Sequence, residues 1–448
     1  MADIAILVYP QAFKPTWKAK DSFEWRGNIG PLMLKDVLER NGYSVDFCSP
    51  ESAGRFKIVL VSLVSIYDYY NFIFSVSRLK SWRQRSNTVF IGGFGLRNAA
   101  PIRNYADYAV FGRGEEIIIA AVSAILAGKD IEGCPSIMKL RHFPHTVTFA
   151  QSATLYPHSL DTKPNKYREH ALGCPHRCYF CIYSHARRFV KEGGDPYYEQ
   201  STQNTMSKEL MLTDIKTKWN GQSIHVRTSI DGWSHRLRYA FNKHISDDDI
   251  IEMIEFVSKK QMSASTIIIA YMITGYPTET ESEMIAFFEL LKRAQPMLGK
   301  VIINLHAIPF RPAPITPSAW LSANINTDWK NRIPNIKIIK QSKYEVNYDR
   351  KGIEGPWSLL QSLIVERATE ATDDIIQTIC FPSPAFKRLC GRGKVDALQH
   401  NYDIEQYTKE YAIEEQTTLP TWYLESYTPN HVIRKNAEQL RANLYGTV

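Results

Sequence analysis

The chain has 448 residues, with 54 Lys and Arg against 46 Asp and Glu, which gives a formal net charge of +8. Hydrophobic residues make up 44% and charged residues 22%, values that are ordinary for a globular protein. Aromatic residues at 12% exclude a mainly disordered chain, and only 23 Gly and 23 Pro exclude collagen-like and low-complexity classes.

The length suggests two or three domains at roughly 150 residues each. The longest apolar runs, Ile58–Ser65 and Ile267–Ile273, are shorter than the roughly 18 residues that a membrane span needs. Met1–Pro10 carries Asp3 where a signal peptide would carry positive charge, and no cleavage pattern follows. We therefore expect a cytoplasmic protein without a membrane span.

The first 130 residues alternate strand and helix patterns. The expected strands are Ile4–Val8, Ser44–Phe47, Ile58–Ser65, Thr88–Ile91 and Tyr108–Phe111, and the expected helices are Leu32–Leu38, Tyr69–Trp82 and Glu115–Leu126. This alternation predicts an α/β fold, with a Rossmann-like parallel sheet covered by helices on both faces. Ligands of such sheets bind at the carboxyl ends of the strands.

The remaining chain divides into three parts. Residues 131–165 are expected to form a connector with a hairpin of Ser136–Leu140 and Thr146–Ala150. Residues 166–316 form a second α/β region, and residues 317–448 form a C-terminal extension, expected to cap the open side of that region. The second region has expected helices at Met206–Trp219, Asp247–Lys260 and Glu281–Ala294, and expected strands at Ser223–Arg227, Ser265–Ile273 and Lys300–Ile308.

Three of the seven cysteines crowd into one short segment, Gly173-Cys174-Pro175-His176-Arg177-Cys178-Tyr179-Phe180-Cys181. An odd, clustered set is typical of metal binding or catalysis rather than of a disulfide framework. The spacing C-x3-C-x2-C suits three irons of a cubane cluster whose fourth iron stays open. The alternative is a zinc site whose fourth ligand is His176 or His185.

This segment resembles the signature of the radical S-adenosylmethionine (radical SAM) superfamily, including its opening Gly-Cys-Pro and an aromatic residue, Phe180, before the last cysteine. The resemblance implies a [4Fe-4S] cluster held by Cys174, Cys178 and Cys181, with S-adenosylmethionine on the fourth iron. It also implies a partial (β/α)6 barrel of the TIM type. The implied activity is reductive cleavage of S-adenosylmethionine to a 5′-deoxyadenosyl radical, and Phe180 is assigned to the cofactor site.

Two further stretches resemble segments of the same superfamily. In the stretch from Ile230 to Ser246, which includes Asn242-Lys243, the resemblance places Asp231, Ser234 and Arg238 at the cofactor. The alternative for this stretch is that Ser234 caps a helix and Arg238 is solvated.

The second stretch, Ile273–Thr280, resembles the strand-end Gly-x-Pro-x-Glu-Thr turn, where Gly275 lets the backbone approach a ligand. The superfamily's Gly-Gly-Glu is represented only by Gly193-Gly194-Asp195, which we interpret as a turn. The ligand of the methionine amine is therefore not identified.

The N-terminal region resembles cobalamin-binding domains that precede radical SAM barrels, through Val89–Phe94 and Phe111–Glu116. The usual D-x-H-x-x-G is absent, and residues 1–130 contain no histidine. Bound cobalamin is possible, but we favour a Rossmann-like domain that no longer binds it. Gly92, Gly93 and Gly95 would then serve a tight strand–helix turn.

Positive charge gathers near the cysteines, and a second basic run covers residues 330–351. The first group contains Lys166, Arg168, Arg177, Arg187, Arg188 and Lys191, against Glu169 alone. These groups predict docking of an acidic reducing partner such as a flavodoxin, or of a nucleic acid such as DNA. A solvated surface is the ordinary alternative.

Three functions follow from these patterns. The first is a radical SAM enzyme that modifies a nucleic-acid base. As a whole-chain impression it resembles phage-type enzymes that isomerise an amino-acid adduct on hypermodified thymidine in DNA. The second is a cobalamin-dependent radical SAM methyltransferase acting on a small molecule, and the third is a zinc-stabilised nucleic-acid-binding protein. Asn304 and His306 share one strand face, where they either contact substrate or bond each other. Catalytic residues are not assigned.

Overall fold

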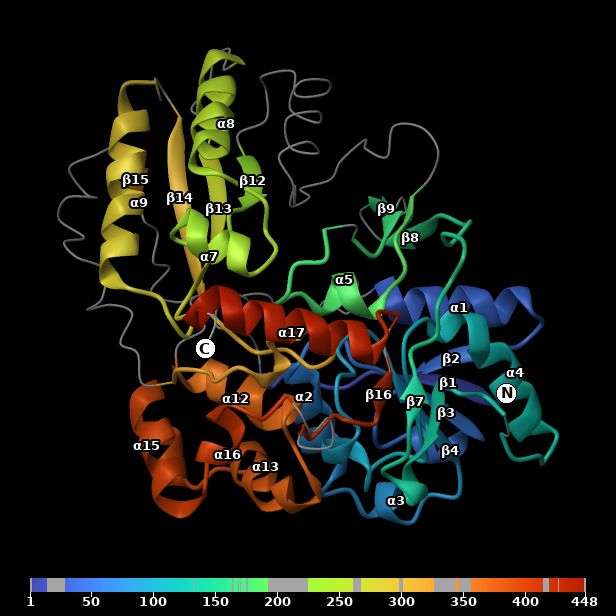
Figure 1. Cartoon of the computed structure of the whole chain (residues 1–448). Helices are drawn as coiled ribbons and strands as arrows, with labels where there is room; N and C mark the ends of the chain where they lie inside the picture. The colour runs from blue at the N-terminus through green and yellow to red at the C-terminus, as the bar shows by residue number, and fades with distance from the viewer. Residues whose placement is uncertain are drawn as a thin grey trace.

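A computed structural model of the chain shows an α/β protein with two parallel-rich sheets and a helical C-terminal region, which confirms the expected fold class (Figure 1). The structure describes the chain outside residues 1, 14–28, 132, 163–164, 168, 170, 175, 192–224, 261–266, 298–300, 326–343, 346–355, 414–418, 426 and 447–448. No helix among the described residues is long and apolar enough to cross a membrane.

The N-terminal sheet has the strand order β2-β1-β3-β4-β5-β6. Its strands are β1 (Ile4–Leu7), β2 (Val45–Cys48), β3 (Ile58–Ser62), β4 (Thr88–Gly92), β5 (Tyr108–Val110) and β6 (Ile137–Lys139). All neighbours are parallel except β5 and β6. The central strands read as continuous apolar runs because helices cover both faces. Helices α1 (Ile29–Arg40) and α4 (Gly114–Leu126) bury apolar side chains on one face.

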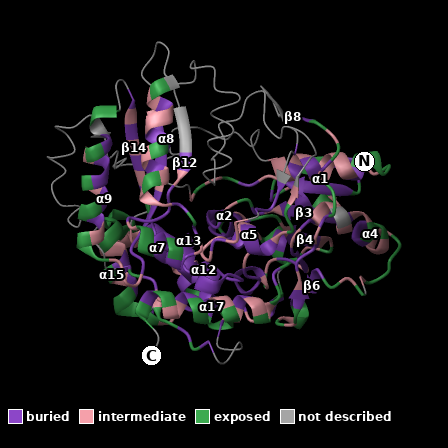
Figure 2. Cartoon of the chain, turned by 45° about the horizontal axis from the view of Figure 1, so that its top comes forward, coloured by how far each residue is buried: buried purple, intermediate pink, exposed green. Residues whose placement is uncertain are grey.

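Helix α2 (Tyr67–Val76) covers the other face and is buried almost all round. Helices α12 (Pro356–Glu366) and α13 (Asp373–Cys380) pack on it, so the C-terminal region shares the core of the N-terminal sheet (Figure 2). The expected helix Tyr69–Trp82 is interrupted. It ends at Val76, and a short α3 (Lys80–Arg83) follows, because Arg83 donates two hydrogen bonds to the carbonyl oxygen of Ser77.

The two expected connector strands form but do not pair with each other. β6 extends the N-terminal sheet, because the edge of β5 offers unpaired backbone groups. β7 (Val147–Thr148) pairs with β16 (Leu424–Glu425) near the C-terminus. The hairpin of this region is instead β8 (Leu160–Thr162) with β9 (Asn165–Tyr167).

The second sheet has four described strands, all parallel, in the order β12 (His225–Ser229), β13 (Ile267–Thr274), β14 (Ile302–Pro309) and β15 (Tyr344–Glu345). Helices α8 (Asp247–Lys260) and α9 (Glu281–Ala294) have the expected bounds and pack on its outer face. The expected helix Met206–Trp219 and the turn at Gly193–Asp195 lie outside the described residues. Six barrel units therefore stay a prediction.

The remaining elements are short, apart from α15 and α17. They are η3 (Ala53–Arg55), η4 (Ala100–Ile102), η5 (Leu140–His142), β10 (Ala171–Leu172), α5 (Ile182–Ala186), β11 (Val190–Lys191), α7 (His235–Ala240), η6 (Gln295–Met297), η7 (Pro317–Trp320), η8 (Glu370–Thr372), α14 (Pro384–Arg388), α15 (Gly391–Asn401), α16 (Glu405–Thr408) and α17 (Asn430–Tyr445). Helix α17 packs on α7 and η7, and so links the C-terminus to the second sheet (Figure 1).

Candidate active site

A two-stranded antiparallel ribbon, β10 with β11, closes the base of the cysteine loop. Gly173 directly follows β10 with a φ of 70°. A Cβ atom at this position would lie 2.5 Å from the carbonyl oxygen of Arg188. Glycine is therefore required where the loop begins, because it alone tolerates both the positive φ and the close backbone approach.

The thiols of the loop are largely withdrawn from solvent. Cys174 and Cys178 are each 6% exposed, and Cys181 is half-buried at the start of α5. Burial raises the pKa of Cys178 to about 12 and also raises that of Cys174, and the charge of Cys181 adds to both shifts. Thiols of this kind stay protonated near neutral pH unless a metal draws off the proton. Three cysteines from one buried loop therefore fit a metal group bound through sulfur. Within the described part of the chain, no three Cys, His, Asp or Glu side chains are grouped as ligands of a single ion.

The residues just after α7 hold the backbone of the cysteine loop. The side-chain amide of Asn242 donates hydrogen bonds to the carbonyl oxygens of His176 and Arg177, both at 3.1 Å. The backbone N–H of Tyr179 donates to the carbonyl oxygen of Phe241 at 2.9 Å. Asn242 has a φ of 57°, a conformation that asparagine tolerates better than most residues. This segment therefore holds the cysteine loop in place.

A buried ion pair lies beside the thiols. Lys243 Nζ is 2.9 Å from the Asp231 carboxylate, and both residues are less than 10% exposed. Burial alone would lower the pKa of Lys243, but the charges of Asp231 and Cys178 outweigh it and the pKa is raised. The positive charge is thus retained next to the cysteines. Asp231 lies just after β12 with a φ of 61°, so the expected acid stands where a strand ends.

An aromatic cluster places Phe180 near the turn that contains Gly275. The Phe180 ring is 6.2 Å from Phe241, which in turn is 4.2 Å from Tyr276. The Tyr276 hydroxyl donates to the carbonyl oxygen of Asp231 at 2.8 Å. Gly275, the residue before Tyr276, directly follows β13 and has a φ of 84°. The structure therefore gathers Phe180, Asp231 and Gly275 around the cysteine loop.

Ser234 and Arg238 bond to other groups of the protein. The Ser234 hydroxyl accepts from Leu237 N–H and donates to Glu283 at 2.6 Å, so it caps α7. Arg238 is fully buried rather than solvated. Its guanidinium donates to the carbonyl oxygens of Ile245 and Gly232 and to Asp247. The cofactor role of these two residues stays a prediction.

The ring of His185 contacts the backbone of the cysteine loop. Its Nε2 lies 3.2 Å from the carbonyl oxygen of Cys178, and the residue has no solvent exposure. Burial, with the charge of Arg177, lowers its pKa to about 4, so the ring is neutral near pH 7. The Nε2 contact to a carbonyl oxygen differs from the zinc coordination considered above. Sequence reasoning missed this supporting role, although the Cys181-x3-His185 spacing was visible. It named Lys243 only as part of a stretch that resembles the superfamily and assigned it no ion pair.

The inner face of the second sheet is partly polar. Register pairs Tyr271 of β13 with His306 of β14, and their ring centroids lie 5.6 Å apart. Asn304, two residues earlier, has a buried Oδ1 without a hydrogen-bond partner. The alternate residues Ala270 and Leu305 pack in the core beneath α8 and α9. His306 and Asn304 thus face away from that core, as their spacing predicted.

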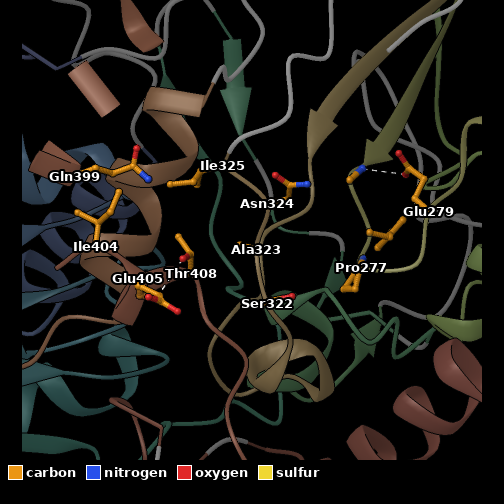
Figure 3. A pocket seen from close by; sticks show the side chains of 12 residues that line it. Pro277, Glu279, Ser322, Ala323, Asn324, Ile325, Gln399, Ile404, Glu405 and Thr408 are labelled. Carbon is orange, nitrogen blue, oxygen red and sulfur yellow. Dashed lines mark hydrogen bonds between the residues drawn. The ribbon is translucent and has the colours of Figure 1, made fainter. Parts of the chain in front are cut away.

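A cavity of about 670 Å³ adjoins Gly275 (Figure 3). One wall is the turn after β13, where Glu279 accepts hydrogen bonds from Gly275 N–H and the Thr274 hydroxyl. The opposite wall comes from α15 and α16, with Gln399 and Glu405. The C-terminal region therefore contributes to a polar cavity at the strand ends of the second sheet.

The carboxyl edge of the N-terminal sheet packs against α5, the helix that directly follows the cysteine loop. A Cβ atom at Gly93 would lie 2.4 Å from Leu63 O, so this glycine serves a close contact between two loops. Phe94, which lies between Gly93 and Gly95, is 37% exposed, and its ring lies 5.6 Å from that of Tyr183 in α5. Arg187 lies 4.9 Å from the Phe94 centroid.

The predicted basic rim is only partly available to a partner. The Arg177 guanidinium lies 5.1 Å from the Tyr427 ring and bonds to Thr428. Arg187 stacks on Phe94 and Tyr183. Arg188 is exposed. The side chains of Lys166, Arg168 and Lys191, and the second basic run, lie outside the described residues.

Comparisons with known proteins give distant similarities, and no family model matches the chain. An uncharacterized protein of Methanocaldococcus jannaschii is 22% identical over 345 residues, which are 66% of this chain and 75% of that protein. The threonylcarbamoyladenosine tRNA methylthiotransferase MtaB of Aquifex aeolicus is 24% identical over 173 residues. That match covers 38% of each chain.

Two solved structures are similar at low identity. The radical SAM methyltransferase TsrM of Kitasatospora setae has a TM-score of 0.49 and 14% identity, over 71% of this chain and 75% of that one. The cobalamin-dependent S-adenosylmethionine radical enzyme OxsB has a TM-score of 0.28 and 9% identity, over 99% and 61%. The chain is thus distantly similar to solved enzymes whose names include radical S-adenosylmethionine chemistry. The narrower resemblance to phage thymidine isomerases finds no support here.

Proposed function

We propose that this protein is a radical SAM enzyme in which Cys174, Cys178 and Cys181 hold a [4Fe-4S] cluster. When bound, the cluster would reduce and cleave S-adenosylmethionine to give a 5′-deoxyadenosyl radical. The observation that carries the proposal is the placement of three buried or half-buried cysteines at the strand ends of a parallel sheet, beside a buried ion pair.

The protein's own residues would position and shield this chemistry. Asn242 fixes the loop backbone, and Phe180 with Tyr276 excludes water on one side. Lys243 keeps a positive charge beside thiolates that would otherwise repel one another. The Asp231 carboxylate, held by Lys243, would accept a hydrogen bond from the amine or ribose of S-adenosylmethionine.

Iron and zinc are separated by one experiment. After anaerobic reconstitution with iron and sulfide, we expect about four irons per chain, and cleavage of S-adenosylmethionine to methionine and 5′-deoxyadenosine by added dithionite. Stoichiometric zinc, with no iron retained and no cleavage, would favour the zinc-stabilised nucleic-acid-binding protein instead.

Cobalamin-dependent methyl transfer to a small molecule is the second candidate function. It is favoured by the exposed Val64 and Phe94 at the carboxyl edge of the N-terminal sheet, where Phe94 contacts Tyr183 of α5, the helix after the cysteine loop. The fit is incomplete. Residues 1–130 supply no histidine for cobalt, and the tight Gly93 contact is used by the fold itself. Retention of added cobalamin through gel filtration, by absorbance, tests it; no retention would remove this candidate.

Substrate and partner stay open to experiment. A nucleic-acid base as substrate and a flavodoxin as reductant are proposals that rest on the basic residues near the cysteines, of which Arg188 is exposed. Product formation from oligonucleotides and from small molecules would separate the two candidate functions.

A further inference from the structure

A cavity of about 410 Å³ lies at the amino ends of the strands of the N-terminal sheet. Its walls are the end of α2, the segment around α3, the loop before β5 and helix α13. The cysteine loop lies at the opposite, carboxyl edge, because α5 contacts Phe94 just after β4. This cavity is therefore separate from the candidate active site.

The lining is basic. Arg83 and Arg85 are the charged residues among those that line it. The surrounding segment 78–85 contains four cations, Arg78, Lys80, Arg83 and Arg85, and no acid. A cavity whose charged lining is only guanidinium favours an anionic ligand.

Both guanidiniums keep unused donor capacity. Arg83 donates hydrogen bonds from Nε and Nη2 to the carbonyl oxygen of Ser77, at 3.0 and 2.6 Å. These bonds fix the side chain and leave the N–H groups of Nη1 available to a ligand. Arg85 donates Nη1 to the carbonyl oxygen of Trp82 at 3.4 Å and Nη2 to Asp107 at 3.1 Å, so each of these two nitrogens keeps one further N–H. These remaining N–H groups can donate to an acceptor bound in the cavity.

The neutral groups add a further donor. Gln377 donates to the Tyr105 hydroxyl oxygen at 2.6 Å, so the phenolic O–H remains to donate elsewhere. Trp82 donates its indole N–H to the backbone carbonyl oxygen of Tyr105 at 3.0 Å, which holds these two lining residues together. The arrangement offers donors from two guanidiniums and one phenol.

From these observations we propose that the cavity binds a phosphate monoester of small-metabolite size through Arg83 and Arg85. Guanidinium forks match phosphate oxygens in geometry and charge, and the volume leaves room for a group attached to the phosphate. The proposal does not rest on the radical SAM assignment, so loss of S-adenosylmethionine cleavage leaves it standing.

The test is calorimetric titration of the full chain, at about 0.15 M salt, with ribose 5-phosphate and with ribose. We expect ribose 5-phosphate to bind and ribose not to bind. Arg83→Gln and Arg85→Gln should each weaken binding at least about tenfold, the loss expected for one charge-assisted hydrogen bond. Arg141→Gln, at an arginine 67% exposed in the same domain, is the control and should bind as the parent does.

Three results would overturn the proposal: no binding to the parent protein, equal binding of ribose and its phosphate, or unchanged affinity in both glutamine variants. Should Arg85→Gln fail to fold by circular dichroism, Arg83→Lys keeps the charge but loses the fork. It should still bind more weakly than the parent, and parent-like affinity in Arg83→Lys would contradict recognition by the guanidinium fork.

Discussion

The two parallel sheets of this protein end in glycine-containing turns, yet their carboxyl edges differ in chemistry. In the N-terminal sheet, Gly93 makes a close contact with Leu63, and two large apolar residues beside this contact, Val64 and Phe94, are exposed. In the second sheet, Asp231 and Lys243 form a buried ion pair next to three cysteines. A glycine-rich strand end therefore marks close packing as readily as a ligand site, whereas buried charges at a strand end need a functional explanation.

The largest expected effect is loss of the cluster. Alanine at any one of Cys174, Cys178 or Cys181 should abolish cleavage of S-adenosylmethionine, because each thiolate would hold one iron. Cys390→Ala, at an exposed cysteine, is the matched control and should retain full cleavage. Cys48, Cys134 and Cys380 should likewise be dispensable. Cleavage that survives in any one of the three loop variants would contradict the ligand set.

The buried ion pair should be next in size. Lys243→Met leaves the Asp231 carboxylate without its buried partner, and we expect a loss of about 3–5 kcal/mol in the free energy of unfolding. Lys259→Met, which removes a 72% exposed lysine from a helical pair, should cost under about 0.5 kcal/mol.

The double variant Lys243→Met with Asp231→Asn keeps this prediction testable if the single variant does not fold. It should recover much of the lost stability, because no buried charge is left unpaired. Denaturant unfolding measures all three variants. A Lys243→Met protein as stable as the parent would show that the ion pair does not stabilise the fold.

The packing role of the N-terminal glycines gives a smaller effect. Gly93→Ala introduces a Cβ atom 2.4 Å from Leu63 O at a φ of 101°, so the two loops must separate. Gly128→Ala has a φ of 70° but open space around it, and should cost only about 1–2 kcal/mol. Thermal unfolding should rank Gly93→Ala below Gly128→Ala. Equal midpoints would mean that the glycine is free to serve a ligand.

The smallest effect distinguishes capping from cofactor binding at Ser234. Ser234→Ala should cost about 1 kcal/mol through the lost helix cap, with the KM for S-adenosylmethionine unchanged. A several-fold rise in KM without loss of stability would instead support the cofactor contact implied by the family resemblance.

Much of the fold and the heart of the site could be predicted from the sequence, because both rest on local patterns. Helices Asp247–Lys260 and Glu281–Ala294 match their expected bounds, and the cysteine spacing is itself local. The pairing of β6 and β7 with other strands could not be predicted, since the partners lie elsewhere in the chain. The same holds for Lys243 and His185, whose roles depend on what folding brings beside them.

The C-terminal region shows the same limit. The sequence predicts that it caps the second α/β region, and part of it does border the cavity at Gly275. Its helices α12 and α13, however, complete the core against α2. Nothing in residues 356–380 signals that partner, because an apolar helix face does not specify what covers it.

The most direct test of the central claim is low-temperature electron paramagnetic resonance of the reconstituted, reduced protein, recorded with and without S-adenosylmethionine. We expect a [4Fe-4S]⁺ signal whose g-values change when the cofactor is added, because one iron would carry no protein ligand. A cluster signal that S-adenosylmethionine leaves unaltered, or no cluster signal at all, would contradict it.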